Sequence, residues 1–450
     1  WLKYSLLVNH QADGCFFMAR IGSIWRHRAW EVPSGPSAGV WRPCLDAVGR
    51  RFVGQVSPSA LKPVARRAKI LRGEGTIETV GRVLALQRQG RDIVRMEVGD
   101  PDFDTPRHIV DAAAAALRGG ATHYAPAGGC PALREAAASF LRRTRPGLEA
   151  DPAQILCMPG GKPIIFHTIA ALCEEGDEVI YPDPGFPAYE TTIRWSGATP
   201  VPLRLDEESG FRFSHERLSA LASPRTKLII LCSPGNPTGG VLRAEDLDFA
   251  ADVAQRHGAW VLSDEIYSQL VFDGHHDSIA TRPCMLERTV VLDGCSKAYA
   301  MTGWRVGFGL FPEPLMEPAL NIAINSWTCL PPFVASGARA ALTSAGEETQ
   351  AMREEYQARR DLVFESLNRI PGIRVAVRPA GAMYLLANVS GTGLTSGVFA
   401  DRLLEEGSVA LLDAQHFGAA GDGLVRISFA QSRERLAEGC RRIAEFVAAL

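Results

Sequence analysis

A lysine, a serine and an arginine lie close together in the segment from Ser296 to Gly307, which reads SKAYAMTGWRVG. Lys297 follows an apolar run, residues 289–292, that predicts a buried strand. A desolvated amine at the end of such a strand loses charge and can attack a carbonyl carbon, so Lys297 is a candidate for a Schiff base with a bound aldehyde cofactor. The Arg305 fork and the Ser296 hydroxyl can bind one phosphate. A solvated basic loop is the alternative that this segment alone leaves open.

Three further side chains stand at or just beyond predicted strand ends. Asp264, in VLSDEIY, closes a hydrophobic strand, where an ionised carboxylate is costly unless a cation such as a protonated pyridine nitrogen pairs with it. Asn236, in SPGNPTGG, offers an amide donor in a turn whose bond to Pro237 can be cis. Tyr267 can share the phenolic oxygen of the same ring with Asn236, although a packing role for this tyrosine is equally compatible with the sequence.

Two more segments contain residues that could bind a phosphate or stack on a planar ring. Gly160 and Gly161 precede a helix that we expect to start near Pro163, so their backbone amides and the helix dipole can receive a phosphate. Phe186, in DPGFPAYE, follows another predicted strand and can stack on a planar heteroaromatic ring. Taken singly, a Gly-Gly turn is a weak signal, and an aromatic residue at such a place is more often part of the core.

Short apolar runs alternate with helical segments between residues 154 and 311, a pattern that predicts an α/β fold with a mostly parallel sheet. Helices over 163–175 and 244–257 would cover the sheet, and ligands would bind beyond the carboxyl ends of the strands. The predicted strands are Ile155 to Met158, Glu178 to Tyr181, Lys227 to Cys232, Trp260 to Ser263, Thr289 to Leu292 and Val306 to Phe311. Past Pro332 a long charged helix over 346–368, a strand over 383–387 and a closing helix from Ser432 predict a second, smaller domain.

Composition excludes several classes of protein. With 450 residues, 46% of them hydrophobic and 22% charged, the chain is long enough for two or three domains, and its net charge of −2 argues against a nucleic-acid or membrane partner. The ten cysteines include no CxxC pair, so we expect reduced thiols, a cytoplasmic location and no metal site. Adjacent His275 and His276 predict a solvated loop rather than a metal site. Residues 1–56, rich in Trp and Arg, predict a non-family extension, either disordered or an artefact.

From Ser57 to the C-terminus the chain resembles the aspartate aminotransferase family, the class I/II aminotransferases of pyridoxal-phosphate fold type I. The motifs that carry the resemblance occur in the family order: VGDPDFDTP, THYAPAGG, PGGKP, PGFPAYE, SPGNPTGG, SDEIY, SKAYAMTGWRVG, PAGAMYLL and VRISFA. The resemblance implies a large domain with a mostly parallel central sheet and a smaller α+β C-terminal domain. It places an N-terminal arm at 57–105, the large domain at 106–329 and the small domain at 330–450.

The resemblance also implies a role for each motif residue. Lys297 would hold pyridoxal 5′-phosphate covalently and act as the catalytic residue, and Asp264 would pair with the pyridine nitrogen. Asn236 and Tyr267 would contact the ring oxygen, and Phe186 would stack on the ring. The phosphate would be bound by Gly161, Lys162, Ser296 and Arg305, the first two through their backbone, and by Tyr124 of a neighbouring subunit in a homodimer. Arg426 would bind the substrate α-carboxylate, with a backbone group of Gly99 nearby.

The implied reaction moves the amino group of an L-amino acid to a 2-oxo acid, with ping-pong kinetics through pyridoxamine phosphate. A C–S lyase, an oxidase or a cyclising synthase of the same fold is the alternative, because the same carbanion serves all of them. A second alternative is a protein that binds the cofactor without catalysing a reaction.

Two departures from the family pattern concern the site. Residues 294–297 read GCSK where many relatives have SxSK, so Gly294 replaces a serine and one phosphate hydroxyl is missing. The sequence Asp413 to Gly418 replaces a PGxxFG loop that would border the substrate, so the choice of substrate side chain stays open. Trp327, Thr328 and Met383 suggest a partly apolar pocket for it.

Overall fold

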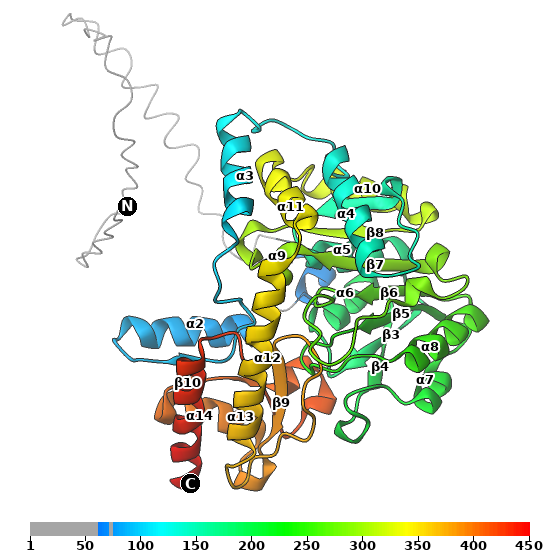
Figure 1. Cartoon of the computed structure of the whole chain (residues 1–450). Helices are drawn as coiled ribbons and strands as arrows, with labels where there is room; N and C mark the ends of the chain where they lie inside the picture. The colour runs from blue at the N-terminus through cyan, green and yellow to red at the C-terminus, as the bar shows by residue number, and fades with distance from the viewer. Residues whose placement is uncertain (1–61, 72–74) are drawn as a thin grey trace, which may run out of the picture. The chain divides into compact units, whose positions relative to one another are not determined.

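The computed structural model describes residues 62–71 and 75–450. The whole predicted extension, residues 1–56, and part of the predicted arm therefore lie outside the described residues. Residues 64–450 form one compact unit. The unit is built on a sheet of seven strands in the order β2-β8-β7-β6-β5-β3-β4, together with smaller sheets (Figure 1).

The large sheet is mostly parallel, as the apolar runs predicted. The seven strands are β2 (Ile155–Met158), β3 (Glu178–Asp183), β4 (Thr199–Arg204), β5 (Thr226–Cys232), β6 (Trp260–Asp264), β7 (Thr289–Gly294) and β8 (Gly307–Leu310). Only β8 runs against its neighbours, pairing antiparallel with both β2 and β7. The sequence analysis missed β4, because its two prolines weaken the strand signal; β4 lies at the edge of the sheet, where a strand tolerates proline.

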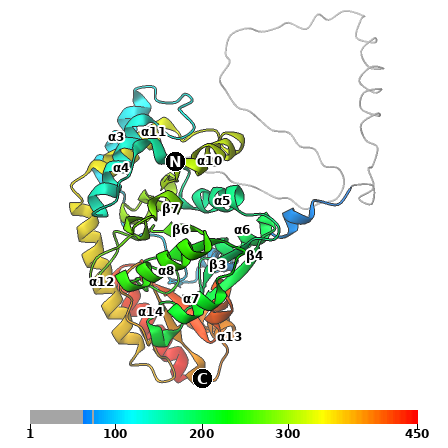
Figure 2. The same ribbon diagram turned by 90° about the vertical axis from the view of Figure 1, so that its right-hand side faces the viewer.

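Successive strand residues point to opposite faces, and each face is covered by helices. On one face, α5 (Gly161–Leu172), α6 (Ala188–Ser196) and α10 (Glu313–Ser326) pack against residues such as Leu262 and Leu292. On the other face, α7 (His215–Leu221) and α8 (Ala244–His257) cover one half. The other half is covered by α3 (Arg107–Arg118), α4 (Pro131–Thr144) and α11 (Pro332–Thr343), which lie together in both views (Figures 1 and 2).

The C-terminal part forms a second layer around a small antiparallel sheet with the strand order β11-β12-β9. The family resemblance implied a smaller α+β part of this kind. Its elements are α12 (Glu347–Leu367), β9 (Tyr384–Asn388), α13 (Ser396–Arg402), β10 (Val409–Ala410), β11 (Leu412–Asp413), β12 (Leu424–Ser428) and α14 (Arg433–Ala448). The N-terminal strand β1 (Val94–Arg95), which follows α2 (Gly75–Arg88), pairs with β10. The backbone N–H of Ser428 then donates to Met96 O at 2.8 Å, so the segment that leads to Gly99 is tied to this layer.

The domain boundaries stay a prediction. The helix α11 lies beyond residue 330 yet packs against α3 and α4 beside the large sheet. From α11, α12 runs toward the small sheet, where it packs against α14 (Figures 1 and 2).

We expect Gly439→Val to weaken the attachment of this N-terminal segment. A side chain at Gly439 in α14 would lie 2.7 Å from Met96 Sδ and 3.0 Å from Val94 Cγ1, so these side chains or the strand that carries them would have to shift. Overpacking of this kind lowers the free energy of unfolding by about 1–3 kcal/mol, which denaturant titration measures. Gly81→Ala in α2 is the control, because nothing lies within 4 Å of the added methyl group, and it should raise stability by about 0.5–1 kcal/mol. Equal effects of both substitutions would contradict the packing argument.

Candidate active site

A cavity of about 550 Å³ lies at the carboxyl ends of β5, β6 and β7 and at the start of α5. It brings together eleven of the predicted site residues: Gly99, Gly161, Lys162, Phe186, Asn236, Asp264, Tyr267, Ser296, Lys297, Arg305 and Arg426. Tyr124 is the exception. It is 90% exposed and lies in a different hollow beside Cys329 and Phe333.

Lys297 lies on the short helix α9 (Cys295–Ala298), which directly follows β7. Its Nζ donates to the carbonyl oxygen of Gly99 at 2.7 Å and lies 6.0 Å from the centre of the Tyr267 ring. A side chain at Gly99 would overlap the hydroxyl of Tyr384, so only glycine lets this backbone approach the cavity. The amine is therefore held by one backbone oxygen and faces the cavity.

Asp264 is buried at the end of β6, with 5% of its surface exposed. Its carboxylate accepts hydrogen bonds from Tyr189 Oη at 2.6 Å and from the Ile266 N–H at 3.3 Å, and neither donor is a cation. Burial raises the pKa of Asp264 to about 6, and the nearby charges of Asp293 and Glu265 add to the rise, against the lowering effect of the two hydrogen bonds. A cation that bound beside this carboxylate would be strongly favoured.

The start of α5 forms an anion cradle. Gly160, the residue before the helix, has a φ of 96°, and the backbone N–H groups of the first helical turn have no partner within the helix. A side chain at Gly160 would overlap the guanidinium of Arg305, so the glycine allows Arg305 to reach the helix start. Arg305 itself has a φ of 56°, a backbone conformation that costs energy in a residue with a side chain and is often found at functional sites. The buried Ser296 lines the same cavity.

Arg426 closes the opposite side of the cavity from β12. Its guanidinium carbon lies 4.3 Å from the centre of the Tyr384 ring and 4.6 Å from that of Phe417, so the group is held between two aromatic rings. Its Nη1 donates to Asn236 Oδ1 at 3.0 Å and its Nη2 to the carbonyl oxygen of Glu97 at 2.6 Å. The guanidinium is thus oriented before any ligand arrives. Asn236 precedes a cis bond to Pro237, which fits the Asn-Pro turn expected from the sequence.

These groups fit pyridoxal phosphate. The helix start with Arg305 and Ser296 suits a dianionic phosphate, and the uncompensated Asp264 suits a protonated ring nitrogen. The Lys297 amine suits an aldehyde, and Phe186 in the cavity wall suits a planar ring.

The structure adds residues that the sequence analysis did not assign to the site. Tyr189 supports Asp264, and Tyr384 Oη lies 2.9 Å from Tyr267 Oη. Both tyrosines belong to motifs already recognised, PGFPAYE and PAGAMYLL, and Phe417 lies in the departing loop. No sequence period shows which of these aromatic residues face the cavity.

Two expectations about neighbouring residues were wrong. Trp327, Thr328 and Met383 do not line this cavity, and Trp327 instead stacks on His167 with ring centres 6.4 Å apart. His276 is buried rather than solvated, and its Nε2 lies 2.9 Å from Glu265 Oε2. The loop is folded back because the buried carboxylate of Glu265 requires partners. Among the described residues there is no group of three or more His, Cys, Asp or Glu that could hold a metal ion.

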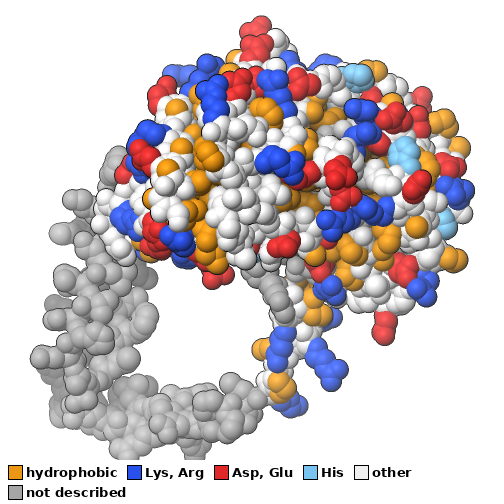
Figure 3. Space-filling model, turned by 90° about the horizontal axis from the view of Figure 1, so that it is seen from below, with side chains coloured by type: hydrophobic (Ala, Val, Ile, Leu, Met, Phe, Trp, Pro, Cys, Tyr) orange, Lys and Arg blue, Asp and Glu red, His pale blue; other side chains and the backbone are white. Residues whose placement is uncertain are grey.

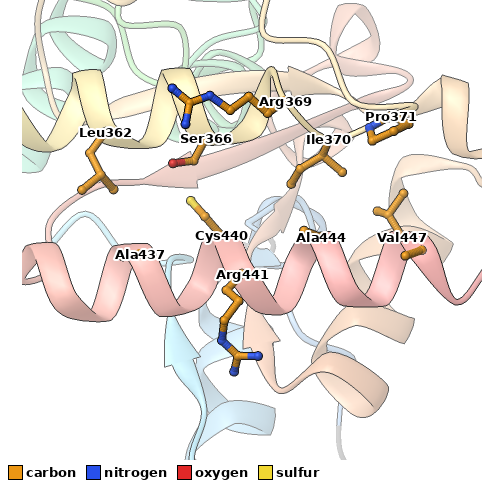
Figure 4. Close-up of a pocket in the computed structure, with 11 residues that line it drawn as sticks. Leu362, Ser366, Arg369, Ile370, Pro371, Ala437, Cys440, Arg441, Ala444 and Val447 are labelled. Carbon is orange, nitrogen blue, oxygen red and sulfur yellow. The ribbon is translucent and has the colours of Figure 1, made fainter.

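A second hollow, of about 460 Å³, lies between α12 and α14 (Figure 4). Its wall includes Leu362, Ile370 and Val447, and the side chain of Arg441 points away from α12. This groove holds none of the predicted site residues. On the face shown in Figure 3, Lys and Arg side chains are interspersed with Asp and Glu. Over the described residues, no helix has the length and apolar character that crossing a membrane requires.

We expect Asp264→Asn to stabilise the protein in the absence of cofactor at pH 8. The folded protein holds the Asp264 proton with a pKa of about 6, above the ordinary value of 3.8, so the ionised carboxylate costs stability above pH 6. This cost disappears as the pH falls toward 4. A shift of two pH units corresponds to about 3 kcal/mol, so the free energy of unfolding should rise by about 2–3 kcal/mol at pH 8 and hardly at all at pH 4.

Asp246→Asn is the matched control in denaturant titrations at both values of pH. Asp246 is also buried, but its carboxylate lies 2.9 Å from Arg212 Nη1 and 3.1 Å from His215 Nε2, so its removal should lower stability at pH 8. A loss of stability in Asp264→Asn at pH 8 would show that the carboxylate is compensated.

Comparison with known proteins agrees with this geometry. The family model of aminotransferase class I and II matches residues 91–443. The chain is 41% identical over 363 residues to the arginine–pyruvate transaminase AruH of Pseudomonas aeruginosa. The aligned residues make up 81% of this chain and 92% of the relative. It is 39% identical over 357 residues to an aspartate aminotransferase of Pyrococcus abyssi, over 78% of this chain and 91% of the relative.

Among solved structures, the aspartate aminotransferase of Thermus thermophilus with maleate superposes with a TM-score of 0.82 at 36% identity, covering 86% of this chain and 100% of that one. Class I and II aminotransferases use pyridoxal phosphate, for which the residues of the cavity provide a fit. The chain belongs to the class I and II aminotransferases, and it is a pyridoxal-phosphate-dependent transaminase of amino acids with the α/β fold of aspartate aminotransferase.

Proposed function

We propose that Lys297 is the catalytic residue of this transaminase and that Asp264 and Arg426 hold cofactor and substrate on either side of it. The proposal is carried by one observation: the Lys297 amine, the uncompensated Asp264 carboxylate and the oriented Arg426 guanidinium all face one cavity. Bound pyridoxal phosphate supplies an electron sink for the carbanion that forms when the amino acid loses its Cα proton.

Lys297 is the group that moves this proton. Its Nζ is held by the single hydrogen bond to Gly99 O at 2.7 Å, and it faces the cavity between Asp264 and Arg426. A lysine in this position serves as general base toward Cα of the amino acid. The backbone oxygen of Gly99 orients the amine.

Arg426 binds the α-carboxylate of the substrate. A guanidinium presents a planar fork that matches a carboxylate through two hydrogen bonds. The rings of Tyr384 and Phe417 hold the fork in place, so the Arg426 side chain loses little further entropy when it binds the substrate and positions the Cα beside Lys297.

The remaining residues of the cavity hold the cofactor. The backbone of Gly161 and Lys162, the Ser296 hydroxyl and the Arg305 guanidinium would bind its phosphate. Asp264 would keep the ring nitrogen protonated. Phe186 would stack on the ring, and Asn236 and Tyr267 would contact the ring oxygen. These assignments agree with the placement of all eight side chains or backbone segments around one cavity.

The donor is an L-α-amino acid and the acceptor a 2-oxo acid. By their names, the two relatives described above act on arginine and on aspartate. A third relative, from Thermococcus litoralis and 38% identical, is an aromatic-amino-acid aminotransferase. Because these identities are so similar, arginine, aspartate and phenylalanine are the donors to compare first.

The active protein is a dimer in which Tyr124 completes the phosphate site of the partner. Tyr124 is 90% exposed and is absent from the cavity of its own chain. Ile324, another large apolar residue, is 46% exposed. A second copy would cover both and would bring a hydroxyl to the phosphate.

The reaction is tested by mixing the purified holoenzyme with single amino acids without a 2-oxo acid. We expect bound pyridoxal phosphate to be converted to pyridoxamine phosphate, with release of the matching oxo acid, and the fastest donor identifies the substrate. Release of ammonia, a thiol or peroxide instead would identify a lyase or an oxidase. In Lys297→Ala the half-reaction should be slower by at least about a thousandfold, because the general base is lost; retained activity would show that another group moves the proton.

The dimer is tested by sedimentation over a range of protein concentrations together with Tyr124→Phe. We expect a dimer whose affinity for pyridoxal phosphate falls about tenfold in the variant, since one hydrogen bond to a charged group is lost. A monomer that binds the cofactor with unchanged affinity in Tyr124→Phe would contradict the shared site.

A further inference from the structure

We infer that Arg145 is a positioning residue for the reaction, because it bridges the end of β6, which carries Asp264, and the end of β7, which leads into the helix that carries Lys297. The inference rests on the roles proposed above for these two residues. Arg145 directly follows α4, far from both in the sequence, and its side chain is 0% exposed. It lies behind the floor of the cavity and does not line it.

The guanidinium joins two carboxylates that lie on neighbouring strands. Its Nε donates to Glu265 Oε2 at 2.7 Å, and its Nη2 donates to Asp293 Oδ2. Its Nη1 donates to Thr144 Oγ1 at 2.7 Å, which anchors the fork to the end of α4. All three nitrogens of the group therefore have partners.

Each carboxylate stands next to a residue of the proposed site. Glu265 follows Asp264 at the end of β6, and Asp293 lies in β7 four residues before Lys297. Since neighbouring strand residues point to opposite faces, Asp264 and Leu292 face the cavity while Glu265 and Asp293 face away from it, toward α4. The backbone N–H of Glu265 donates to Leu292 O at 2.8 Å, so the bridge supports the last hydrogen bond between the two strands.

The other oxygens of the two carboxylates are also satisfied. Glu265 accepts hydrogen bonds from Ser263 Oγ at 2.8 Å and Ser278 Oγ at 2.6 Å, and it lies 2.9 Å from His276 Nε2. Asp293 accepts from Ser268 Oγ at 2.8 Å and from the Gly294 N–H at 2.7 Å, directly before the helix that carries Lys297. Because all four oxygens of the two carboxylates have partners, the network favours one arrangement of the strand ends.

The charge of Arg145 is also needed by these groups. Burial alone would raise the pKa of Glu265, but the charge of Arg145, assisted by His276 and two hydrogen bonds, lowers that pKa to about 2. Without Arg145, two adjacent carboxylates would be buried with no full cation between them, and one strand end would have to move or take up a proton. A lysine keeps the charge but cannot bridge both carboxylates in the same way, because it lacks the planar fork.

The test compares Arg145→Lys with Arg360→Lys in the holoenzyme. Arg360 in α12 is the matched control, since its side chain is also 1% exposed and binds Asp361 and Asp273 together with Pro379 O at 2.9 Å, none of which lines the cavity. Both variants should lower the melting temperature. Rapid mixing with an amino acid gives two quantities. One is the limiting rate of the half-reaction, divided by the amount of bound pyridoxal phosphate, and the other is the amino-acid concentration at which half of this rate is reached. Fluorescence titration gives the dissociation constant for pyridoxal phosphate.

For Arg145→Lys we expect the limiting rate to fall about tenfold, because a small misplacement of reacting groups has effects of this size. Half-saturation by the amino acid should change less than threefold, and the dissociation constant for pyridoxal phosphate should rise about fivefold on the same argument. For Arg360→Lys the rate and the cofactor affinity should stay within twofold of the unaltered protein. The inference is overturned if Arg145→Lys also stays within twofold, or if Arg360→Lys shows the same losses.

If Arg145→Lys does not fold, Asp293→Asn serves instead. The amide keeps the shape of Asp293 and can still accept from the Gly294 N–H, but it loses the charged bond to Arg145 Nη2. A limiting rate at least threefold lower supports the bridge, and an unchanged rate overturns it. A failure of the unaltered protein to form pyridoxamine phosphate would instead contradict the proposed function, so the two failures are distinguishable.

Discussion

The hydrogen-bonded register of β5, β6 and β7 is the constraint on which the rest of the site depends. Cys232 pairs with Asp264, and Asp264 pairs with Leu292, so the carboxyl ends of three parallel strands stop at one edge of the sheet. Each strand then continues into a segment of the site: the turn with Asn236, the segment with Tyr267 and the helix with Lys297. A change of register by one residue would turn Asp264 away from the cavity and bring Glu265 into it.

The two consecutive carboxylates at the end of β6 show how one sheet supports opposite electrostatic conditions. Asp264 has only a tyrosine hydroxyl and a backbone N–H as partners, and its pKa is raised to about 6. Glu265 has a buried arginine, two serines and a histidine, and its pKa is lowered to about 2. Both residues are buried, so the difference comes from their partners. The face toward the cavity is open to an external cation, whereas on the face toward α4 the guanidinium of Arg145 is shared by Glu265 and Asp293.

Close backbone contacts bring the separate segments into this arrangement. Gly99 leaves room for the hydroxyl of Tyr384, and Gly160 leaves room for the guanidinium of Arg305. Gly307, in β8, lies so near Gly160 that a side chain there would come within 2.8 Å of the Gly160 carbonyl carbon. Because these contacts join the N-terminal segment to β9, and the start of α5 to Arg305 and β8, the cavity is formed by parts of the chain that are distant in sequence.

The amino-acid sequence by itself determined the fold class and the positions of six of the seven strands of the large sheet, and eleven of the twelve residues that its motifs and family resemblance predicted for the site line one cavity. Continuous apolar runs predict parallel strands, and a reactive side chain after each run lies at their common edge. The sequence did not indicate that Tyr189, Tyr384 and Phe417 also line the cavity, since these residues have the same character as residues of the core. Nor did it indicate that Arg145 and His276 are buried beside Glu265, because their partners are distant in sequence. The tertiary structure alone decided these placements, because the partners of a buried charge depend on which segments the packing brings together.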